Sequence, residues 1–144
     1  MGGHDGMSIF NSVECFDPEQ GKWLMVTPML NRRCRLGAAA LNGKLYACGG
    51  YDGGQFLRTA ECYDPVADKW TAVPQMNVKR SRVSLVANCG KLFAIGGYDG
   101  ISNLSSMEVF TLEDNCWKFG ASMAAHEGGV GIGVVPIIPK TDIS

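Results

Sequence analysis

The stretch GGYDGGQFLRTAECYDPVADKWTAVPQM, which runs from Gly49 to Met76, decides the fold of this chain because its main features occur three times. Seven of its residues recur at a fixed spacing of 47 residues. They are the pairs Gly2-Gly3, Gly49-Gly50 and Gly96-Gly97, the pairs Asp5-Gly6, Asp52-Gly53 and Asp99-Gly100, the glutamates Glu14, Glu61 and Glu108, the tryptophans Trp23, Trp70 and Trp117, and the methionines Met29, Met76 and Met123. The 144 residues are therefore a tandem array of three units.

Each unit is expected to contain four short strands separated by turns. Asn42-Gly43 is a strong hairpin signal between two apolar runs, and the glycine pairs permit sharp bends where a strand ends. Units of this length are typical of β-propeller blades, so the sequence predicts an all-β fold. The expected strands are 36–41, 44–48, 58–63 and 70–73 in the second unit, and 83–88, 91–95, 105–110 and 116–119 in the third.

The number and phase of the units predict a partial propeller. Propellers close with about four to eight blades, so we expect three units to be a fragment of a longer chain. Two complete blades are expected at about 36–75 and 83–122, after a half blade at 11–26 and before a single strand at Gly129–Val135. The repeats are expected to cover 1–136, with unit boundaries near 2–48, 49–95 and 96–136, and a C-terminal tail at 137–144.

Residues that recur in every copy are expected to serve the architecture. Aromatic residues stand seven positions apart in each unit, as Phe16 and Trp23 do in the first, and we expect them to pack adjacent blades together. Arg33 and Arg80 each precede a repeat glutamate by 28 residues, which predicts an ion pair within the blade. The predicted structural residues are Gly2, Gly3, Gly49, Gly50, Gly96, Gly97, Trp23, Trp70, Trp117, Glu14, Glu61, Glu108, Arg33 and Arg80.

Charge and cysteine content narrow the classes of partner and the compartment. A formal net charge of −1 argues against nucleic acid or an anionic membrane as the main partner. The six cysteines include no C-x-x-C pair, which favours buried thiols in a reducing compartment. Cys15 and Cys62 share one repeat phase and are expected to occupy equivalent packed positions. Because no secretory signal precedes the first repeat, we expect a cytoplasmic protein.

The order of these motifs resembles the kelch repeat: Gly-Gly, Tyr-Asp-Gly, Glu-Cys-Tyr-Asp-Pro, a tryptophan, Pro-x-Met and an arginine-rich turn. The resemblance covers 2–136, and this part of the chain is similar to the BTB-kelch (kelch-like) family. In that family a six-bladed kelch propeller follows BTB and BACK domains. The resemblance implies that the chain is part of a propeller that recognises substrates. That propeller would belong to an adaptor of a cullin-RING E3 ubiquitin ligase, in the Ubl conjugation pathway. Cullin is held by the BTB region in that family, and no part of this chain resembles BTB or BACK.

The sequence predicts that this chain is not an enzyme. The glycine-rich run 128–133 fails the pattern G-x-G-x-x-G because Val134 stands at the third glycine position. His126-Glu127 lacks a second histidine one turn later, and the only other histidine is His4. We therefore expect no catalytic residues, no metal site and no cofactor.

Two kinds of loop are expected to meet on one rim of the propeller. Arginines gather at 32–35 and 79–82, after the last strand of a blade, and aromatic residues gather at 51–56 and 98–103, after the glycine pairs. Chain direction alternates from strand to strand, so both loop types leave the sheet at the same edge. Guanidinium groups suit carboxylates, and tyrosine supplies rigid contact area. The resemblance implies that a protein substrate or peptide motif binds through His4, Cys34, Arg35, Tyr51, Phe56, Ser81, Arg82, Tyr98 and Asn103.

A protein-interaction module is the expected function, and two versions of it stay open. One is the ligase adaptor that the resemblance implies, and the alternative is an actin-binding, cytoskeletal kelch protein. An arginine-rich rim fits either version. An actin co-sedimentation assay would discriminate between them.

Overall fold

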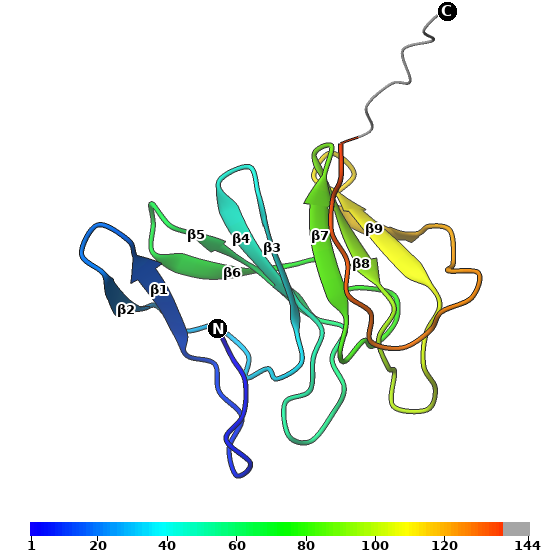
Figure 1. The fold of residues 1–144 in the computed structure, drawn as a ribbon, viewed down its shortest axis with the longest axis horizontal. Coiled ribbons are helices and arrows are strands. Elements are labelled where there is room, and N and C mark those ends of the chain that lie inside the picture. Colours follow the sequence, from blue (N-terminus) through cyan, green and yellow to red (C-terminus); the bar gives the residue numbers. More distant parts are fainter. Residues whose placement is uncertain (137–144) are drawn as a thin grey trace, which may run out of the picture.

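A computed structural model describes residues 1–136 and shows an all-β chain, as the sequence predicts (Figure 1). The described part contains ten strands and no helix, and thus no helical segment that could cross a membrane. The predicted tail, 137–144, lies outside the described residues. The strands are β1 (Val13–Asp17), β2 (Lys22–Val26), β3 (Gly37–Leu41), β4 (Lys44–Cys48), β5 (Ala60–Asp64), β6 (Lys69–Val73), β7 (Ser84–Asn88), β8 (Lys91–Ile95), β9 (Met107–Thr111) and β10 (Cys116–Phe119).

The two complete blades that the repeat spacing predicts are confirmed. Strands β3 to β6 form one four-stranded antiparallel sheet, β7 to β10 form the other, and β1 and β2 pair alone as a half blade. Each expected strand of the complete blades begins and ends within two residues of an observed one. Asn42 and Gly43 have φ values of 50° and 72°, the left-handed values that a tight hairpin turn requires. The glycine pairs lie between the second and third strands, so blade boundaries fall inside the sequence units.

The glycine pairs allow neighbouring blades to approach each other closely. Gly49 has a φ of 64°, and a Cβ atom there would lie 2.2 Å from the carbonyl oxygen of Arg80 in the connection to the next blade. The amide of Gly50 donates to the same oxygen at 2.8 Å. A Cβ atom at Gly2 or Gly96 would likewise lie 2.3 or 2.4 Å from a backbone oxygen. Only glycine combines this backbone conformation with this contact.

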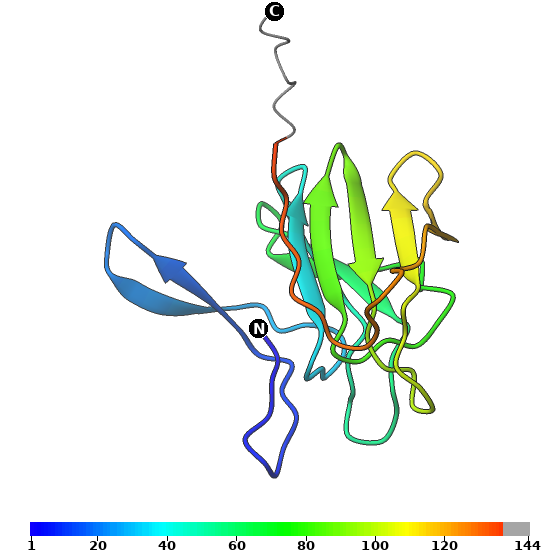
Figure 2. The same cartoon turned by 45° about the vertical axis from the view of Figure 1, so that its right-hand side comes forward.

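The segment Gly129–Val135 was expected to form a strand, and this prediction is wrong: the structure has no strand there. The segment runs beside β7 (Figures 1 and 2), where the Ser84 hydroxyl donates to the Val130 carbonyl. A β-ladder requires a partner strand in the same blade, and residues 1–136 supply none for it. The connection that leads to this segment is also one residue longer than the connection that leads to the third blade. The amide of Gly97 donates to the carbonyl of Gly128, whereas the amide of Gly50, 47 residues before Gly97, donates to the carbonyl of Arg80, 48 residues before Gly128.

Apolar clusters fill the spaces between blades. Val13 of the half blade and Trp70 of the second blade belong to one cluster. Phe110 and Trp117 of the third blade belong to another, together with side chains of the second blade. Within each blade the two aromatic residues also face each other across neighbouring strands, with ring centroids 5.2 Å apart for Phe110 and Trp117. The aromatic residues therefore pack within blades as well as between them.

Each buried tryptophan also forms a hydrogen bond to the blade before it. The Nε1 of Trp70 donates to the carbonyl of Thr27, which follows β2. The Nε1 of Trp117 donates to the carbonyl of Pro74, which follows β6. Both bonds are 2.8 Å long and span 43 residues. The ring thus marks a fixed docking point between consecutive blades.

The half blade departs from the equivalence that the repeat phase predicts. Trp23 is 66% exposed, although its counterpart Trp70 is only 3% exposed. Cys15 is exposed, so it does not share the packed position of Cys62. Glu14 is exposed too. Trp70 packs against the half blade before it, Glu61 pairs with Arg33, and Cys62 is covered by a cluster that includes the inner strands of its blade. The described residues supply no such blade, arginine or inner strands for the first unit.

Two buried arginine–glutamate pairs fix the connections between blades. Arg33 Nη2 lies 2.9 Å from a carboxylate oxygen of Glu61, and both side chains are buried. Arg80 Nε lies 2.9 Å from Glu108, and both side chains are fully buried. Each arginine also donates to backbone carbonyls of its blade, as Arg80 Nη1 does to Gly96 at 2.9 Å. These pairs, which the 28-residue spacing predicts, hold the chain that enters a blade against its third strand.

Candidate functional site

The structure brings the two kinds of rim loop together at the lower edge of Figure 1. We call residues 4–9, 32–35, 51–56, 79–82 and 98–103 the rim. Within it, Cys34 and Tyr51 exchange two backbone hydrogen bonds of 2.9 Å, and Ser81 and Tyr98 exchange two of 2.8 Å. Isolated bridges also join Tyr51 to Phe56, Tyr98 to Asn103 and His4 to Ile9. The rim is therefore a set of loops tied to one another through their backbones.

A repeated aspartate stabilises each loop that follows a glycine pair. The Oδ1 atom of Asp99 accepts the amides of Ile101 and Ser102 at 2.7 and 2.8 Å. Asp5 accepts the amides of Met7 and Ser8 in the same way. These backbone hydrogen bonds hold the pKa of Asp99, and likewise that of Asp5, below the ordinary value of 3.8. The recurring Asp-Gly pairs are thus explained by a turn that the carboxylate closes.

Acid should loosen these loops. Because the folded pKa of Asp99 is lowered, its carboxylate contributes stability that is present above 3.8 and is lost as pH falls through the folded pKa. We expect the amide proton shifts of Ile101 and Ser102 to move below about pH 3.8, measured by an NMR titration. The matched variant Asp99→Asn keeps an acceptor oxygen but does not titrate, so its shifts should stay constant. Equal pH profiles for the two proteins would contradict this account.

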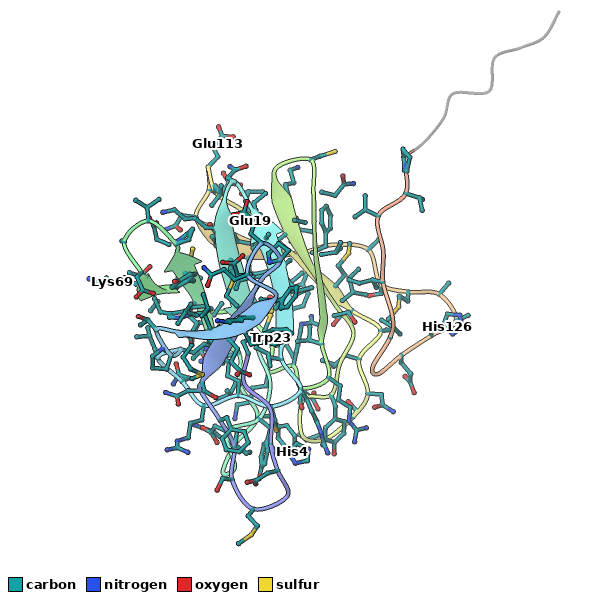
Figure 3. The ribbon with its side chains drawn as sticks, turned by 60° about the vertical axis from the view of Figure 1, so that its left-hand side comes forward. His4, Glu19, Trp23, Lys69, Glu113 and His126 are labelled. Atoms are coloured by element: carbon teal, nitrogen blue, oxygen red, sulfur yellow. The ribbon has the colours of Figure 1, made fainter. Side chains whose placement is uncertain are left out.

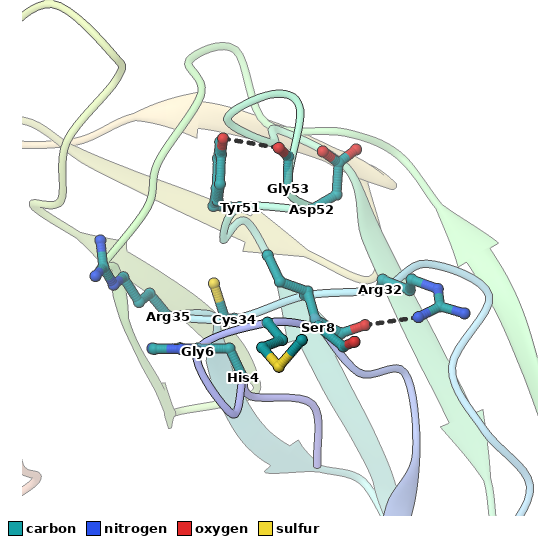
Figure 4. A pocket seen from close by; sticks show the side chains of 11 residues that line it. His4, Gly6, Ser8, Arg32, Cys34, Arg35, Tyr51, Asp52 and Gly53 are labelled. Carbon is teal, nitrogen blue, oxygen red and sulfur yellow. Dashed lines mark hydrogen bonds between the residues drawn. The ribbon is translucent and has the colours of Figure 1, made fainter.

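The rim contains a hollow of about 480 Å³ between the first unit and the second blade (Figure 4). Its wall and floor include His4, Arg32, Cys34, Arg35 and Tyr51. The Tyr51 hydroxyl is held by a 2.9 Å bond to the carbonyl of Gly53, and Arg32 donates to a carbonyl of the facing loop. The hollow is lined by cationic, thiol and phenol groups and by the Asp52 carboxylate, which suits a polar side chain of a partner.

Aromatic rings continue the surface toward the third blade. The ring of Phe56 lies 5.0 Å from that of Tyr51 and 5.4 Å, edge to face, from that of Tyr98. All three side chains are half-buried. Rings that are anchored on one side and open on the other give rigid contact area of the kind found at binding hot spots.

Arg35 and Arg82 occupy equivalent and unusual positions on the rim. Their φ values are 56° and 55°, in a region that bulky residues rarely adopt. The Arg82 amide donates to the Arg35 carbonyl at 2.8 Å, so the two residues lie side by side on consecutive blades. Both are exposed, and within residues 1–136 neither guanidinium donates a hydrogen bond. Strained backbone of this kind is a reason to look for a function.

Cys34 and Ser81 lie directly before these arginines and are buried, at 3% and 1% exposure. The Ser81 hydroxyl has no hydrogen-bond partner in the described structure. A buried hydroxyl without a partner is uncommon, and here it lies beneath the rim. Asn103, by contrast, is exposed.

Sequence reasoning missed part of the site. Arg32, Asp52 and residues 6–9 also line the hollow. Asp52 and Gly6 belong to the repeated Asp-Gly pairs and were recognisable from that signal, whereas residues 7–9 are not among the recurring positions. Among the described residues, no group of three or more His, Cys, Asp or Glu side chains could hold a metal ion.

Comparisons with known proteins fit this arrangement. The family model named Kelch motif matches residues 1–30, 32–77 and 79–124. Kelch-like protein 23 of Homo sapiens is 46% identical over 37 residues, which are 26% of this chain and 7% of that protein. Kelch-like protein 3 of Mus musculus is 41% identical over 49 residues, 34% of this chain and 8% of that protein. The matched stretches thus span less than a tenth of these curated relatives.

A solved structure shares the fold. The chain superimposes on the structure of YjhT with a TM-score of 0.72 over 88% of its own length. It covers 52% of the YjhT chain, and the sequences are 13% identical. The likeness shows the fold alone, and its extent corresponds to a partial propeller.

Proposed function

We propose, from the premise that this chain belongs to the kelch-repeat family, that its rim binds an acidic segment of a protein partner. Arg35 and Arg82 carry the proposal. Their backbones are joined by a hydrogen bond, both residues are exposed, and both adopt a backbone conformation that costs stability. Within residues 1–136 neither guanidinium donates a hydrogen bond. Guanidinium groups bind carboxylates through paired, charge-assisted hydrogen bonds.

The surroundings of the two arginines support the same partner. The hollow beside Arg35 admits a side chain, and the rings of Tyr51, Phe56 and Tyr98 offer contact area between the blades. The Ser81 hydroxyl, buried beneath the rim without a hydrogen-bond partner in the described structure, is part of this proposal as a donor to the bound segment. Partner-binding roles for His4, Cys34 and Asn103 are part of this proposal.

We propose that this partner is a substrate for ubiquitylation. The runs 81–86, 96–108 and 126–131 resemble the C-terminal blades of kelch-like protein eighteen, and the relatives found by comparison carry kelch-like names. In this proposal the propeller presents the substrate, while a BTB region elsewhere in the same polypeptide holds the cullin. All six cysteines are free thiols, which supports a reducing, cytoplasmic location.

Removing either guanidinium should weaken partner binding by about ten- to a hundred-fold, since a hydrogen bond to a charged group contributes roughly 1.5–3 kcal/mol. The test is to select peptides from a random display library on the purified chain and to measure their affinity by calorimetry for Arg35→Ala and Arg82→Ala. Selected peptides should be rich in Asp and Glu. Lys91→Ala is the matched control, because Lys91 lines a hollow at the opposite edge of the blades.

Unchanged affinity in both arginine variants, or an equal loss in Lys91→Ala, would refute binding at the rim. Actin provides a separate comparison. If the chain co-sediments with actin filaments and the rim variants abolish it, the partner is cytoskeletal and the ligase proposal fails, while the rim itself is retained as the site.

A further inference from the structure

The rim contains two junctions that the same backbone hydrogen bonds build. We call the one between the first unit and the second blade the first junction, and the one between the second and third blades the second junction. In the first, the amide of Gly3 donates to the carbonyl of Arg33 at 2.8 Å. In the second, the amide of Gly50 donates to the carbonyl of Arg80 at the same distance. Differences between the two junctions therefore come from their side chains.

An aromatic side chain fills the second junction. The ring of Phe56 lies edge to face with the ring of Tyr98, with centroids 5.4 Å apart, which is a favourable arrangement for two rings. A Cβ atom at Gly100 would lie 2.8 Å from Cδ2 of Phe56, so the ring packs directly against the backbone there. The second junction thus shows which kind of group its space accepts.

The first junction has a smaller side chain at the same place, and it contains the hollow. Ile9 stands 47 residues before Phe56, and a Cβ atom at Gly53 would meet only its Cδ1 atom, at 3.6 Å. His4 stands where the second junction has Tyr51, and Figure 3 labels it at the lower end of the molecule. The hollow of about 480 Å³ is therefore present where the smaller residues replace the rings.

A ring in the hollow would have the same neighbours as the ring of Phe56. Tyr51, which lines the hollow, stands 47 residues before Tyr98. Gly53, which also lines it, stands 47 residues before Gly100. Figure 4 shows Tyr51 and Gly53 on one side of the hollow. An aromatic side chain could therefore pack here as Phe56 does one repeat later.

The polar groups of the hollow suit a hydroxyl at the end of that ring. Arg35 offers a guanidinium donor and Asp52 a carboxylate acceptor, and both line the hollow. The Oδ1 atom of Asp52 accepts the amides of Gly54 and Gln55, each at 2.8 Å, whereas no group within residues 1–136 donates to its Oδ2 atom. A phenol both donates and accepts. Tyrosine therefore matches this lining better than phenylalanine does.

We infer that the hollow binds a tyrosine side chain of the partner, in the place that the Phe56 ring has at the second junction. The inference rests on the proposed function, because the acidic residues beside this tyrosine would face the exposed guanidinium groups of Arg35 and Arg82. Tyrosine supplies buried contact area and arginine supplies charge, the combination typical of binding hot spots. The recognised motif is thus a tyrosine next to acidic residues.

The first test uses p-cresol, which is the side chain of tyrosine without its backbone. Titrated into the isotope-labelled 144-residue chain, it should shift the backbone amides of Tyr51 and Gly53 in NMR spectra. Ile9→Phe introduces the residue of the second junction and should lower the affinity for p-cresol by about ten-fold or more. Ile101→Phe, at a 90% exposed position on another rim loop, is the matched control and should bind as the parent does.

The reverse exchange provides a second variant. Phe56→Ile should open the second junction, so that p-cresol also shifts the amides of Tyr98 and Gly100. Thermal melts of each variant establish that it is folded. No shift at Tyr51 and Gly53 in the parent, equal affinity in the parent and in Ile9→Phe, or no new shift in Phe56→Ile would overturn the inference.

An acidic peptide from the display selection tests the same site with a partner segment. Replacing its tyrosine by alanine should weaken binding to the parent chain by about ten-fold and change binding to Ile9→Phe little. Selected peptides that require Arg35 but contain no tyrosine, or lose nothing when it is replaced, would overturn this inference and leave the proposed function standing. Binding of p-cresol in the hollow without selection of any acidic peptide would overturn the proposed function instead.

Discussion

Replacing Glu108 by alanine should lower the free energy of unfolding by about 3–5 kcal/mol, because it leaves a buried charge without its partner. Glu108 and Arg80 are both 0% exposed, and their charged atoms lie 2.9 Å apart. The same carboxylate accepts the backbone amide of Asn77 at 2.6 Å and its side-chain amide at 2.8 Å. One substitution therefore removes both the neutralising charge and the anchor of the connection between blades. Urea denaturation, followed by tryptophan fluorescence, measures the loss.

An exposed ion pair in the same blade provides the control. Lys118 and Asp114 lie 2.7 Å apart, but their side chains are 65% and 46% exposed. Because water screens such a pair, Asp114→Ala should cost far less stability than Glu108→Ala. The double substitution Arg80→Met with Glu108→Leu removes both buried charges and should recover much of the stability lost in Glu108→Ala. Equal small losses in Glu108→Ala and Asp114→Ala would show that the buried pair is not what holds the connection.

Replacing Trp117 by alanine should lower the free energy of unfolding by about 3–5 kcal/mol as well, the usual cost of truncating a buried tryptophan. Trp117 is 6% exposed, stacks on Phe110 and donates its Nε1 hydrogen to the Pro74 carbonyl. The variant thus loses packing within its blade and the bond to the preceding blade. Thermal unfolding monitored by circular dichroism measures this effect.

Trp23 offers a matched comparison, because it has the same place in the repeat and a different environment. It is 66% exposed, so Trp23→Ala should cost well under half as much as Trp117→Ala in dilute, monomeric protein. Similar losses for the two variants would mean that the half blade is packed more tightly than the structure indicates. A small loss in both would contradict the role of the tryptophan as a docking point between blades.

The fold could be predicted from the sequence to the extent that it depends on local signals. The strand ends could be predicted from the turn residues Asn42-Gly43 and from the glycine pairs. Because the units repeat every 47 residues, the strands predicted in one unit also predict those of the next. The prediction failed where structure depends on a neighbour. Gly129–Val135 has the composition of a strand but no strand to pair with in the described residues, and Cys15 has the repeat phase of Cys62 without its cover.

The candidate site was predictable in its location and less so in its detail. Alternating chain direction is enough to place residues 32–35 and 51–56 on one edge, where the structure has them. Composition does not reveal the left-handed backbone at Arg35, which arises from how the connection turns between blades. Nor does it reveal that Ser81 is buried without a hydrogen-bond partner, since burial depends on the loops that close over it.

The measurement that tests the central claim most directly is the location of a bound peptide on the chain. An acidic peptide from the display selection would be titrated into isotope-labelled protein, and the shifts of backbone amides recorded by NMR. The account predicts that the largest shifts fall on the rim, at Arg35, Tyr51, Arg82 and Tyr98. The largest shifts at the opposite edge of the blades, at Asn42 and at 89–91 and 111–114, would contradict it.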